Sequence, residues 1–593
     1  MIAAIVLIPL LAAIAGIAVY GNMRAAKKIA VAGSAIAMLL AALVTYGTTQ
    51  FPWFAAGGHT FNISISVTPL NLLLLAMVLV IGLLVMVYSM GYMENVLEQR
   101  RYYIEMLSFE AAMVTFAISG NFIVLFIAWE FLSLTSYLLI GFWHGRQSAI
   151  RAARKAISII FIGDLALLGS MAIFLNLFGT LEFAQIISGM GSAMPAELYA
   201  GILLLLVAVF TKSAQFPFHE WLIDAMEGPT PVSAYLHSST MVKAGVFTVI
   251  LLYPLFSSAQ VSGIIFAFGV LTLVLSTLAA SREMHIKKVI AYSTIQELSI
   301  MLVAVSGGAV LAAIYFFLIQ GFYKALLFFS SGVVMDATGN EYLDKVSGLG
   351  ARKIVFTATL FGVLSLAGFV PFSGFFANEA IGHSFSGATY LLLSGISLLT
   401  SFYIVRWFSY AARDRAKGAV EDAYIAMPGS MVYPIAALAL LTLVASVFFF
   451  SFEGFITYGG YLSYLPVAGG LVLNAADGIF FTAIIAVGAA ASYLIYYRRA
   501  TKHSAGWIGR IMHTGPIVNG AYSVIAAVTG AFAGSVAEFD SWLNDRFDDI
   551  GRAVFRSGYI IRRVTFGSIN GYAMAFAIGL VLLFVSFYYL VVV

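Results

Sequence analysis

The chain has 593 residues, of which 62% are hydrophobic and only 10% are charged. This composition excludes a soluble globular protein, because apolar runs of about 20 residues, the length that crosses a bilayer as a helix, recur from end to end. The formal net charge of +4 is informative only through its distribution along the chain. The absence of cysteine excludes iron–sulfur clusters and disulfides here, so any redox chemistry must lie on other subunits.

Sixteen apolar runs are long enough to span a membrane. By residue number they cover 2–20, 28–48, 68–92, 106–120, 121–143, 155–178, 198–227, 231–255, 261–281, 286–306, 308–335, 354–382, 388–411, 431–452, 476–497 and 570–593. The first run lacks a basic leader and a cleavage site, so we read it as a retained helix. We therefore expect an all-α polytopic membrane protein with about 16 transmembrane helices.

Lysine and arginine are concentrated in alternate connections between these runs. The basic connections carry Arg24, Lys27 and Lys28; Arg100 and Arg101; Arg146, Arg151, Arg154 and Lys155; Arg282, Lys287 and Lys288; Lys345, Arg352 and Lys353; and Arg413, Arg415 and Lys417. The even-numbered connections carry no Lys or Arg. Among the odd-numbered connections the seventh is the exception, because it is acidic. Because positive residues stay on the cytoplasmic side, both termini are predicted to face outward.

The connection 498–569 differs from the other loops, because it is about as charged as a soluble protein and has alternating apolar positions. If about 60 of its residues were helical, it would extend roughly 90 Å along the membrane. Pro516 and repeated glycines exclude one straight rod. Two short amphipathic helices on the cytoplasmic surface are the simpler interpretation.

Residues 211–245, TKSAQFPFHEWLIDAMEGPTPVSAYLHSSTMVKAG, combine apolar helical sequence with many ionisable side chains. An ionisable group in hydrocarbon costs several kcal/mol, so it persists only where it lines a wet cavity or meets a partner. Pro217 is predicted to break the helix just after Lys212. A similar Pro-Phe element recurs in GFVPFSGFF at 368–376. Paired broken helices with a lysine at mid-membrane depth are typical of ion-translocating proteins.

Lys212 is the principal candidate for proton transfer. Burial favours the neutral form of a lysine and a nearby carboxylate favours the charged form, so moving the carboxylate away makes the lysine release its proton. A lysine that reaches the interface is the alternative, but more apolar sequence follows it. Glu130, in FIAWEFLSLTSYLL, and Asp164, in IIFIGDLALLG, are buried carboxylates with either a transport role or a structural salt bridge or hydrogen bond.

His237 and Lys243 lie on the next run. On one continuous helix, six residues correspond to a rotation of about 240°, so the two side chains cannot share a face. A hydrogen-bonded core histidine is the alternative role for His237. Lys324, in YFFLIQGFYKALLFF, has no basic neighbour and no loop within a turn, which favours a functional role. Glu379 follows the second Pro-Phe element and is either an exit group or a helix-end carboxylate.

No other chemistry is indicated by the sequence. Serine, histidine and aspartate form no nucleophile arrangement, and there is no phosphate loop or cysteine–histidine metal cluster. His219 and Glu220 lack the second histidine, four residues from the first, that a zinc site of this type requires.

The stretch 211–245 resembles the most distinctive segment of the antiporter-like subunits of respiratory complex I. The resemblance is strongest to the distal NuoL type (NADH dehydrogenase subunit 5) and to relatives in Mrp antiporters. AWEFLSLTSYLLIGF, IKKVIAYSTIQELSIM and FYKALLFFSSGVVMDATG are similar to the same family, so the resemblance covers nearly the whole chain. It implies two inverted five-helix repeats, broken helices 7 and 12, and a long lateral amphipathic helix before the last span.

The resemblance also implies a division of the chain. The implied parts are helices 1–3 at 1–105, helices 4–8 at 106–260, helices 9–13 at 261–415, helices 14–15 at 416–497, the lateral helix at 498–569 and helix 16 at 570–593.

The family's functional positions can be matched residue by residue. Glu130 matches the fifth-helix glutamate, Asp164 the sixth-helix carboxylate and Lys212 the seventh-helix lysine. His237 matches the eighth-helix bridging residue and Lys324 the eleventh-helix lysine. The implied proton path comprises Glu130, Asp164, Lys212, His237, Lys243, Lys324 and Glu379.

The chain departs from the NuoL pattern at several positions. Phe316 and Gln320 replace frequent histidines, Asn378 and Glu379 replace a Lys-Asp pair, and Phe161 replaces a frequent arginine. Lys243, in HSSTMVKAG, follows the Mrp pattern more closely. We therefore expect the residues that carry protons in the cytoplasmic half-channel and at the exit to differ from those of NuoL.

The implied function is that of a proton-translocating, redox-inactive membrane subunit of a complex I-like NADH:quinone oxidoreductase. Electron transfer in partner subunits would change the pairing of Glu130 with Lys212, and protons would then pass through His237 and Lys324 toward Glu379. No cofactor is expected in this chain. Flavin or deazaflavin, iron–sulfur clusters and quinone or phenazine are expected on partner subunits.

The expected partners are other antiporter-like and small membrane subunits in the plasma membrane of a prokaryote, with no nucleic acid. A Na⁺/H⁺ antiporter subunit of Mrp type is an alternative, although the large Mrp subunit usually continues well beyond the point where this chain ends. A structural brace of the membrane arm is the other alternative, but it would not need the buried charges. Bicarbonate-uptake relatives tend to be shorter and to lack the lateral helix.

Overall fold

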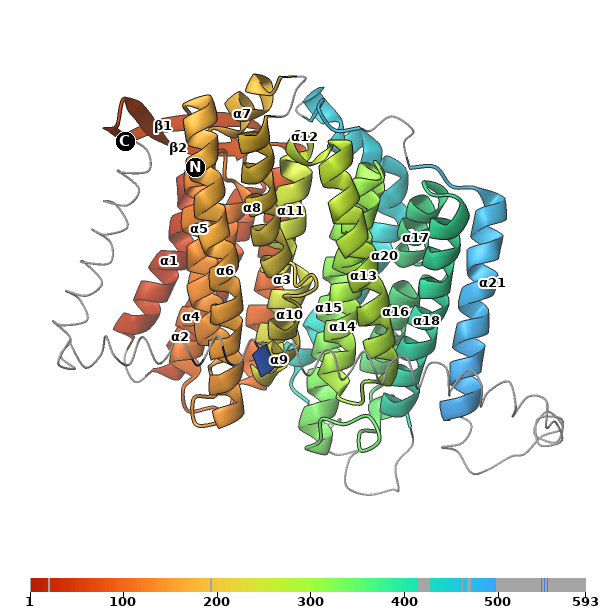
Figure 1. Cartoon of the computed structure of the whole chain (residues 1–593). Coiled ribbons are helices and arrows are strands. Elements are labelled where there is room, and N and C mark those ends of the chain that lie inside the picture. The colour runs from red at the N-terminus through yellow and green to blue at the C-terminus, as the bar shows by residue number, and fades with distance from the viewer. Residues whose placement is uncertain are drawn as a thin grey trace.

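The computed structural model describes residues 2–19, 22–191, 195–413, 427–460, 462–466 and 471–497, and residues 545, 546, 549 and 552. In this part of the chain the helices run roughly side by side along one direction (Figure 1). The predicted lateral helix at 498–569 and the predicted last span at 570–593 lie outside the described residues, apart from those four positions.

The first half of the described chain contains a hairpin and twelve α-helices, one of them followed by a 3₁₀ turn. These elements are α1 (Ile2–Ala18), α2 (Met23–Ala41), β1 (Gly47–Ala56), β2 (His59–Val67), α3 (Pro69–Tyr92), α4 (Gln99–Ala117), α5 (Phe122–Ile140), α6 (Gln147–Phe178), α7 (Phe183–Gly189), α8 (Ala196–Lys212), α9 (Glu220–Asp224), η1 (Ala225–Glu227), α10 (Thr230–Ser238), α11 (Lys243–Leu251) and α12 (Tyr253–Phe256).

The second half is helical throughout its described elements. These elements are α13 (Ala259–Arg282), α14 (Ile286–Ser306), α15 (Val310–Thr338), η2 (Leu349–Ala351), α16 (Lys353–Ala367), α17 (Ser373–His383), α18 (Gly387–Ala411), α20 (Gly429–Ile456), η3 (Tyr458–Gly460), α21 (Ala475–Ser492) and η4 (Tyr493–Tyr497).

Nine helices of the described part are long and apolar enough to cross a membrane. They are α3, α5, α6, α13, α14, α15, α18, α20 and α21. The most apolar windows of α14 and α15 are 89% and 100% buried, whereas that of α21 is only 22% buried. The core of the molecule is therefore centred on α14 and α15, and α21 lies at its margin (Figure 1).

Both predicted helix breaks are present. Helix α8 ends at Lys212, and the chain turns through Pro217 before α9 begins at Glu220. In the second half, α16 ends at Ala367, and α17 begins at Ser373 after the turn that contains Pro371. The missing proline N–H in each turn prevents continuation of the helical hydrogen-bond ladder.

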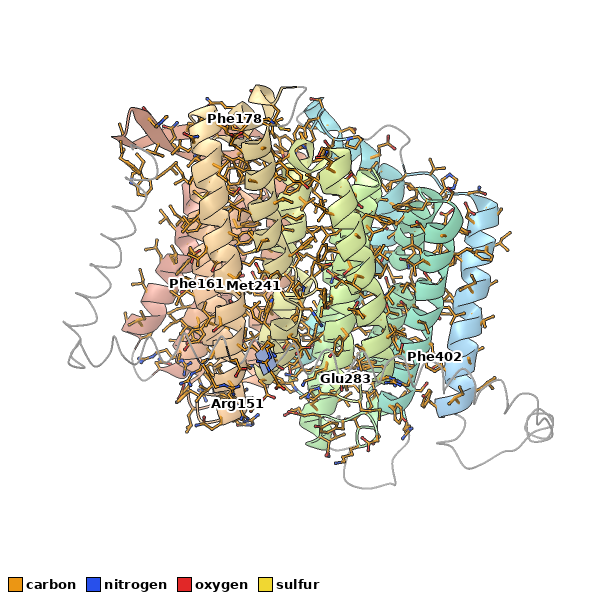
Figure 2. All side chains as sticks on the ribbon, viewed as in Figure 1. Arg151, Phe161, Phe178, Met241, Glu283 and Phe402 are labelled. Atoms are coloured by element: carbon orange, nitrogen blue, oxygen red, sulfur yellow. The ribbon has the colours of Figure 1, made fainter. Side chains whose placement is uncertain are left out.

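The expected continuous helix at 231–255 is wrong, because α10 ends at Ser238 and α11 begins at Lys243. The Thr240 hydroxyl donates a hydrogen bond of 2.6 Å to the Tyr235 carbonyl oxygen. Hydroxyl side chains compete in this way with the helical backbone for its carbonyl groups. Met241, inside the interruption, lies at about mid-height of the molecule (Figure 2).

An all-α chain is also not what the structure shows, because β1 and β2 form an antiparallel hairpin. The hairpin is paired from Gly47↔Val67 to Ala56↔His59, with an irregularity between Pro52 and Phe54. It occupies most of the connection between the predicted apolar runs 28–48 and 68–92, where no strand was predicted. Alternation of apolar and polar residues in HTFNISISV is the pattern that favours such a strand.

The two ends of the molecule differ in charge. Arg151 and Glu283 lie at the lower end, whereas Phe178 and the hairpin lie at the upper end (Figures 1 and 2). The polarity of α6, from Gln147 to Phe178, therefore places the basic connection that precedes it at the lower end. This arrangement agrees with the alternation of charge predicted from the connections.

Candidate functional site

Lys212, the last residue of α8, is completely buried and forms an ion pair with Asp164 of α6. Its Nζ lies 3.9 Å from Asp164 Oδ1 and donates hydrogen bonds to Ser133 Oγ (2.5 Å) and to the Trp129 carbonyl oxygen (3.2 Å). The same Nζ lies 5.0 Å from the Trp129 ring centroid, within the range of a cation–π contact. All of these contacts stabilise the charged form of the lysine.

Asp164 is held by the same two residues of α5. Trp129 Nε1 donates a hydrogen bond of 2.8 Å to Asp164 Oδ1, and Ser133 Oγ donates one of 3.2 Å to Oδ2. Ser133 is therefore within hydrogen-bond distance of both the lysine and the carboxylate. A hydroxyl in this position can pass a proton between the two groups, because it both donates and accepts.

Close contact between α6 and α8 brings this pair together. Gly163 precedes Asp164 on α6, and Thr211 precedes Lys212 on α8. A Cβ atom added at Gly163 would lie only 1.8 Å from Thr211 Oγ1. Only glycine permits that approach. Phe161, on the same helix, lies at about mid-height in Figure 2, so the pair lies near the middle of the apolar layer.

Glu130 does not form the ion pair with Lys212 that sequence analysis expected. It follows Trp129 on α5 and is half-buried, and its Oε1 is enclosed with no hydrogen-bond partner among the described residues. The carboxylate within 4.0 Å of Lys212 Nζ belongs to Asp164. The two carboxylates thus differ, since one is paired with the lysine and the other has capacity to accept a proton or a water.

His237 and Lys243 lie on either side of the interruption between α10 and α11, and both reach α15. His237 is completely buried, neither of its ring nitrogens has a hydrogen-bond partner among the described residues, and its ring centroid lies 5.2 Å from that of Phe328. Lys243 Nζ donates a hydrogen bond to the Phe317 carbonyl oxygen and lies 4.5 Å from the centroid of the Phe317 ring. The same Nζ lies 3.4 Å from Met77 Sδ. Both side chains therefore face α15, His237 at Phe328 and Lys243 at Phe317.

Lys324, in the middle of α15, forms a second buried ion pair, with Glu297 of α14. Lys324 Nζ lies 3.0 Å from Glu297 Oε2 and donates to Ser293 Oγ, and Tyr323 OH donates a hydrogen bond of 3.0 Å to Glu297 Oε1. Lys324 is completely buried and Glu297 is 3% exposed. Glu297 was not among the predicted site residues, although it lies inside the apolar run 286–306, just as Glu130 lies inside the run 121–143.

A chain of side-chain hydrogen bonds links the first break to the second half. Ser213, next to Lys212, donates to the Val242 carbonyl oxygen (2.9 Å) beside Lys243. Gln215 donates to the Ser213 carbonyl oxygen (2.8 Å) and accepts from Ser299 Oγ of α14 (2.9 Å). The turn after α8 thus lies against both α11 and α14, the two helices that carry Lys243 and Glu297.

A third buried cluster lies below the first ion pair, where α6 meets α9. Lys155 Nζ lies 3.3 Å from Glu220 Oε2 and 3.0 Å from Asp224 Oδ2. Sequence analysis assigned Lys155 to a basic connection, but α6 begins already at Gln147 and Lys155 is only 6% exposed. Lys155 follows several arginines at the start of an apolar run, so the sequence does not distinguish this buried lysine from the arginines of the connection.

Glu379 of α17 is buried beside the first turn of α21. Its Oε1 accepts a hydrogen bond of 2.5 Å from the Asn474 backbone N–H, and its Oε2 has no hydrogen-bond partner among the described residues. One turn later, His383 Nδ1 lies 2.9 Å from Asp477 Oδ2, and Tyr390 OH donates a hydrogen bond of 3.0 Å to Asp477 Oδ1. These groups connect a buried carboxylate to partly exposed ones.

A cavity of about 150 Å³ lies at the basic end, in the seam between the two halves. It is lined by Tyr92, Trp143, Arg146, Met226, Glu227, Gly228, Pro229, His285, Lys287, Lys288, Met335 and Glu341. Lys287 is 3% exposed and donates to the carbonyl oxygens of Met226 and Gly228 (2.9 Å for the second). At the rim, the hydrogen bond to His285 holds the pKa of the Glu341 carboxyl below its usual value. Charged walls of both signs suit a water-filled space.

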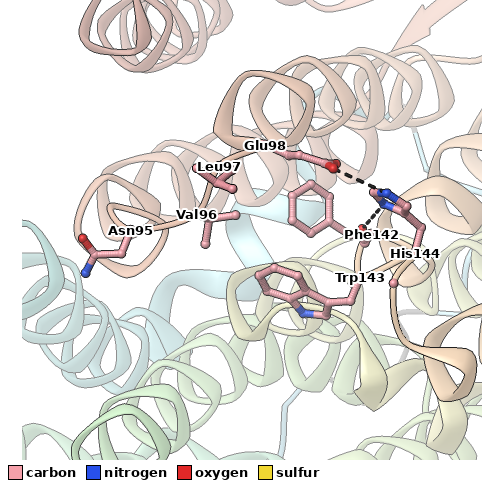
Figure 3. A pocket seen from close by; sticks show the side chains of 8 residues that line it. Asn95, Val96, Leu97, Glu98, Phe142, Trp143 and His144 are labelled. Carbon is pink, nitrogen blue, oxygen red and sulfur yellow. Dashed lines mark hydrogen bonds and ion pairs between the residues drawn. The ribbon is translucent and has the colours of Figure 1, made fainter.

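Another cavity, of about 430 Å³, lies between the loop after α3 and the loop after α5. Figure 3 shows Glu98 beside His144 in its wall, and the two side chains are 3.5 Å apart. Leu97 at its edge is 92% exposed. The charged groups of this cavity are surface groups, so it is separate from the buried ion pairs.

Two protein families match the chain. Residues 119–403 match the family described as NADH:quinone oxidoreductase/Mrp antiporter, TM, and this segment contains every predicted site residue from Glu130 to Glu379. Residues 53–103 match the family described as NADH-Ubiquinone oxidoreductase (complex I), chain 5 N-terminus.

Individual relatives come from both kinds of complex. The chain is 37% identical to a Na(+)/H(+) antiporter subunit from Alkalihalophilus pseudofirmus, over 55% of this chain and 43% of that protein. It is also 37% identical to NADH-quinone oxidoreductase subunit L of Mycobacterium tuberculosis, over 60% of this chain and 58% of that protein. The chain thus spans about half the length of these relatives.

Two solved assemblies contain chains of similar fold. The Mrp complex from Dietzia sp. contains a chain with a TM-score of 0.71 and 26% identity, matched over 90% of this chain and 60% of that one. The membrane-bound sulfane sulfur reductase, an archaeal respiratory membrane complex, contains a chain with a TM-score of 0.72 and 19% identity. That match covers 98% of this chain and 99% of the other, and it shows the fold alone.

Proposed function

We propose that this chain carries protons across the membrane in a complex I-like respiratory oxidoreductase. The premise is that the chain belongs to the family of antiporter-like membrane subunits shared by NADH:quinone oxidoreductases and Mrp antiporters. The observation that carries the proposal is the series of buried lysines at Lys212, Lys243 and Lys324, two of which are paired with buried carboxylates. Such groups persist in apolar surroundings where they have a transport role.

The lysine–carboxylate pair at Lys212 acts as the switch of this path. A buried ammonium group is stable while a carboxylate lies beside it, and removing that charge leaves an uncompensated ion that releases its proton. Asp164 is the paired carboxylate, and Glu130, with an unpartnered oxygen, is the group that competes for the proton. Electron transfer in partner subunits would drive the exchange between these arrangements.

Protons then move from the switch through the centre of the molecule toward the hairpin end. His237 and Lys243 lie between the first broken helix and α15, where Lys324 follows. Glu379 is the exit group, because it is buried and connects to the exposed end of α17. Water molecules bridge the gaps between side chains that are not in contact. The cavity at Lys287 is the entry from the basic end.

The proposal extends to the architecture of the whole chain. Residues 106–260 and 261–415 form two inverted five-helix repeats, which the broken pairs α8/α9 and α16/α17 support. They follow helices 1–3 at 1–105 and precede helices 14–15 at 416–497, the lateral helix at 498–569 and the last of sixteen spans at 570–593. The basic end faces the cytoplasm of a prokaryotic cell and both termini face outward.

The partners in this proposal are other antiporter-like and small membrane subunits. This chain takes no part in the redox steps, because it has no cysteine to hold an iron–sulfur cluster. Flavin or deazaflavin, iron–sulfur clusters and quinone or phenazine belong to the partner subunits.

A Na⁺/H⁺ antiporter subunit is the second candidate function, because the relative from Alkalihalophilus pseudofirmus has that name and the same identity of 37%. The lysines favour protons, since a series of ammonium groups repels a cation but can carry a proton. A structural brace, the remaining alternative, does not explain the buried charges.

The test compares proton pumping with the electron-transfer rate in the reconstituted complex, in low-sodium buffer, for the wild type and Lys212→Ala. We expect pumping per electron to fall while the complex still assembles. Lys353→Ala, at an exposed position at the start of α16, is the matched control and should pump normally. Unchanged pumping in Lys212→Ala would support the brace, and transport that requires added sodium would support the antiporter.

A further inference from the structure

The ion pair between Lys324 and Glu297 contains a lysine of the path above, but its carboxylate has no role there. We propose that Glu297 is a proton-carrying residue, which takes the proton from Lys324 and passes it toward the second broken helix. This inference rests on the proposed function and assigns the second half of the path.

The geometry around Lys324 favours proton transfer to Glu297. Ser293 and Glu297 are four residues apart on α14, so they lie on one face of that helix, and both contact Lys324 Nζ. Tyr323 OH fixes the orientation of the carboxylate through Oε1, which leaves Oε2 toward the lysine. The pair is buried in α15 and α14, the two most enclosed spans of the described part.

The same combination of groups occurs at Lys212. Each lysine contacts one carboxylate and one serine hydroxyl, Asp164 and Ser133 in the first half and Glu297 and Ser293 in the second. The Nζ–carboxylate distance is 3.9 Å in the first pair and 3.0 Å in the second. If the first pair exchanges protons, the second has the groups for the same chemistry and the shorter distance for direct transfer.

The position of His237 also favours this transfer. Gln320 and Phe328, one turn before and one turn after Lys324, share a face of α15 with it. Gln320 Nε2 donates to the His237 carbonyl oxygen (3.4 Å), and the Phe328 ring lies beside the His237 ring. A positive charge that arrives on His237 therefore lies against the face of α15 that carries Lys324, where it repels the ammonium group.

The transfer step is a balanced proton exchange. The Nζ–H bond of Lys324 breaks and an O–H bond forms on Glu297 Oε2, so that the charged pair becomes a neutral amine and a neutral acid. No electron moves and no other reactant is needed. The neutral acid then releases the proton toward Glu379, and Lys324 is recharged from the His237 side, which restores the ion pair.

The experiment measures pumping per electron in the reconstituted complex for Glu297→Gln, Glu297→Asp and Lys212→Ala, side by side. Glutamine keeps an acceptor for the Tyr323 hydroxyl but cannot carry a proton, so pumping should fall to the level of Lys212→Ala. Aspartate should restore pumping in large part. Glu197→Gln, at an exposed position in the first turn of α8, is the matched control and should pump like the wild type.

The outcomes separate this inference from the proposed function. Wild-type pumping in Glu297→Gln, with a loss in Lys212→Ala, would overturn the role of Glu297 alone. Wild-type pumping in both variants would overturn the proposed function and this inference together. If Glu297→Gln fails to assemble, infrared difference spectra of Glu297→Asp during turnover decide the matter. A protonated-carboxyl band that shifts relative to the wild type supports the transfer, and an unshifted band overturns it.

Discussion

At the level of single residues, Lys212 and Lys324 are each held by a carboxylate, a serine hydroxyl and an aromatic neighbour. Lys212 and Lys324 are both completely buried, and each contacts an ion-pair partner from a different helix. In such surroundings the free energy of the ammonium form depends on the partner's charge, because little water is available to replace it. In the proposed mechanism, a change in one carboxylate therefore decides whether the lysine keeps its proton.

Asp164→Asn tests this dependence directly. The amide oxygen can still accept from Trp129 Nε1, so the local packing is kept while the negative charge beside Lys212 is removed. We expect the complex to assemble and the proton flux through this chain to fall by about 10²-fold or more, because positioned acid–base groups contribute about 10²–10⁴-fold. Flux is measured as dye-detected acidification of proteoliposomes. Asp336→Asn, at an exposed site near the end of α15, is the control, and equal flux in both variants would contradict the account.

Sequence reasoning singled out most of the buried charged residues but not their pairing. Lys212, Lys324 and Asp164 stand out because a charged residue inside an apolar run is rare. The pairing of Lys212 with Asp164 instead of Glu130 depends on the contact between α6 and α8, and such a contact between helices is not encoded in local periodicity. Glu297 could have been found by the rule that selected Glu130, whereas Lys155 could not.

At the level of secondary-structure elements, interruptions and one close helix contact position the charged groups. Lys212 is the last residue of its helix, and Lys243 is the first residue of α11. The absence of a side chain at Gly163 lets α6 approach Thr211 of α8. The site therefore depends as much on where helices stop and touch as on the ionisable residues themselves.

Gly163→Ala should separate α6 from α8 at the first ion pair. The added methyl group would lie 1.8 Å from Thr211 Oγ1, and overpacking of this kind costs about 1–3 kcal/mol. We expect a lower melting temperature of the purified complex and reduced pumping per electron.

Gly169→Ala is the matched control on the same pair of helices. Its methyl group would lie 3.1 Å from Leu204 Cδ1, the end of a flexible side chain that can move aside. If Gly163→Ala and Gly169→Ala had the same melting temperature and the same pumping per electron, the contact between Gly163 and Thr211 would not position the ion pair.

Periodicity and composition predicted the elements only in part. The breaks after Lys212 and Ala367 were confirmed because proline has a fixed local effect. The interruption at 239–242 was missed because serine and threonine break a helix only where their hydroxyls find backbone partners, as Thr240 does. The hairpin was missed because its residues were counted as a loop between apolar runs.

At the level of the whole molecule, the proposed direction of transport runs from the end with the basic connections to the end with the hairpin. Positive residues near span ends are retained in the cytoplasm, so the cavity beside Lys287 would open toward that side. The hairpin and Glu379, the proposed exit group, would then face outward.

Single-cysteine variants can establish this orientation, since the chain has no cysteine of its own. Arg151→Cys is placed at the basic end and Thr60→Cys in the exposed part of the hairpin. We expect a membrane-impermeant maleimide to label Arg151→Cys in everted vesicles and Thr60→Cys in right-side-out vesicles. The cysteine-free wild type shows the background, and the reverse labelling pattern would reject the proposed orientation.

The overall class could be read from the sequence with little structural information. The alternation of charged connections and the apolar run lengths already predicted a polytopic helical membrane protein, which nine apolar spans in the described part agree with. The count of sixteen helices and the lateral helix stay predictions, because 498–569 and 570–593 lie outside the described residues apart from four positions. The pairing of distant helices, such as α14 with α15 at Glu297, requires the fold itself.

The most direct measurement follows proton movement into everted vesicles that contain the intact wild-type complex, started first by the electron donor and then by a sodium pulse. The account predicts acidification of the vesicle interior as soon as electrons flow, at the same rate with and without sodium, and no response to sodium alone. Proton movement that appears only after the sodium pulse would contradict it and identify the chain as part of an antiporter.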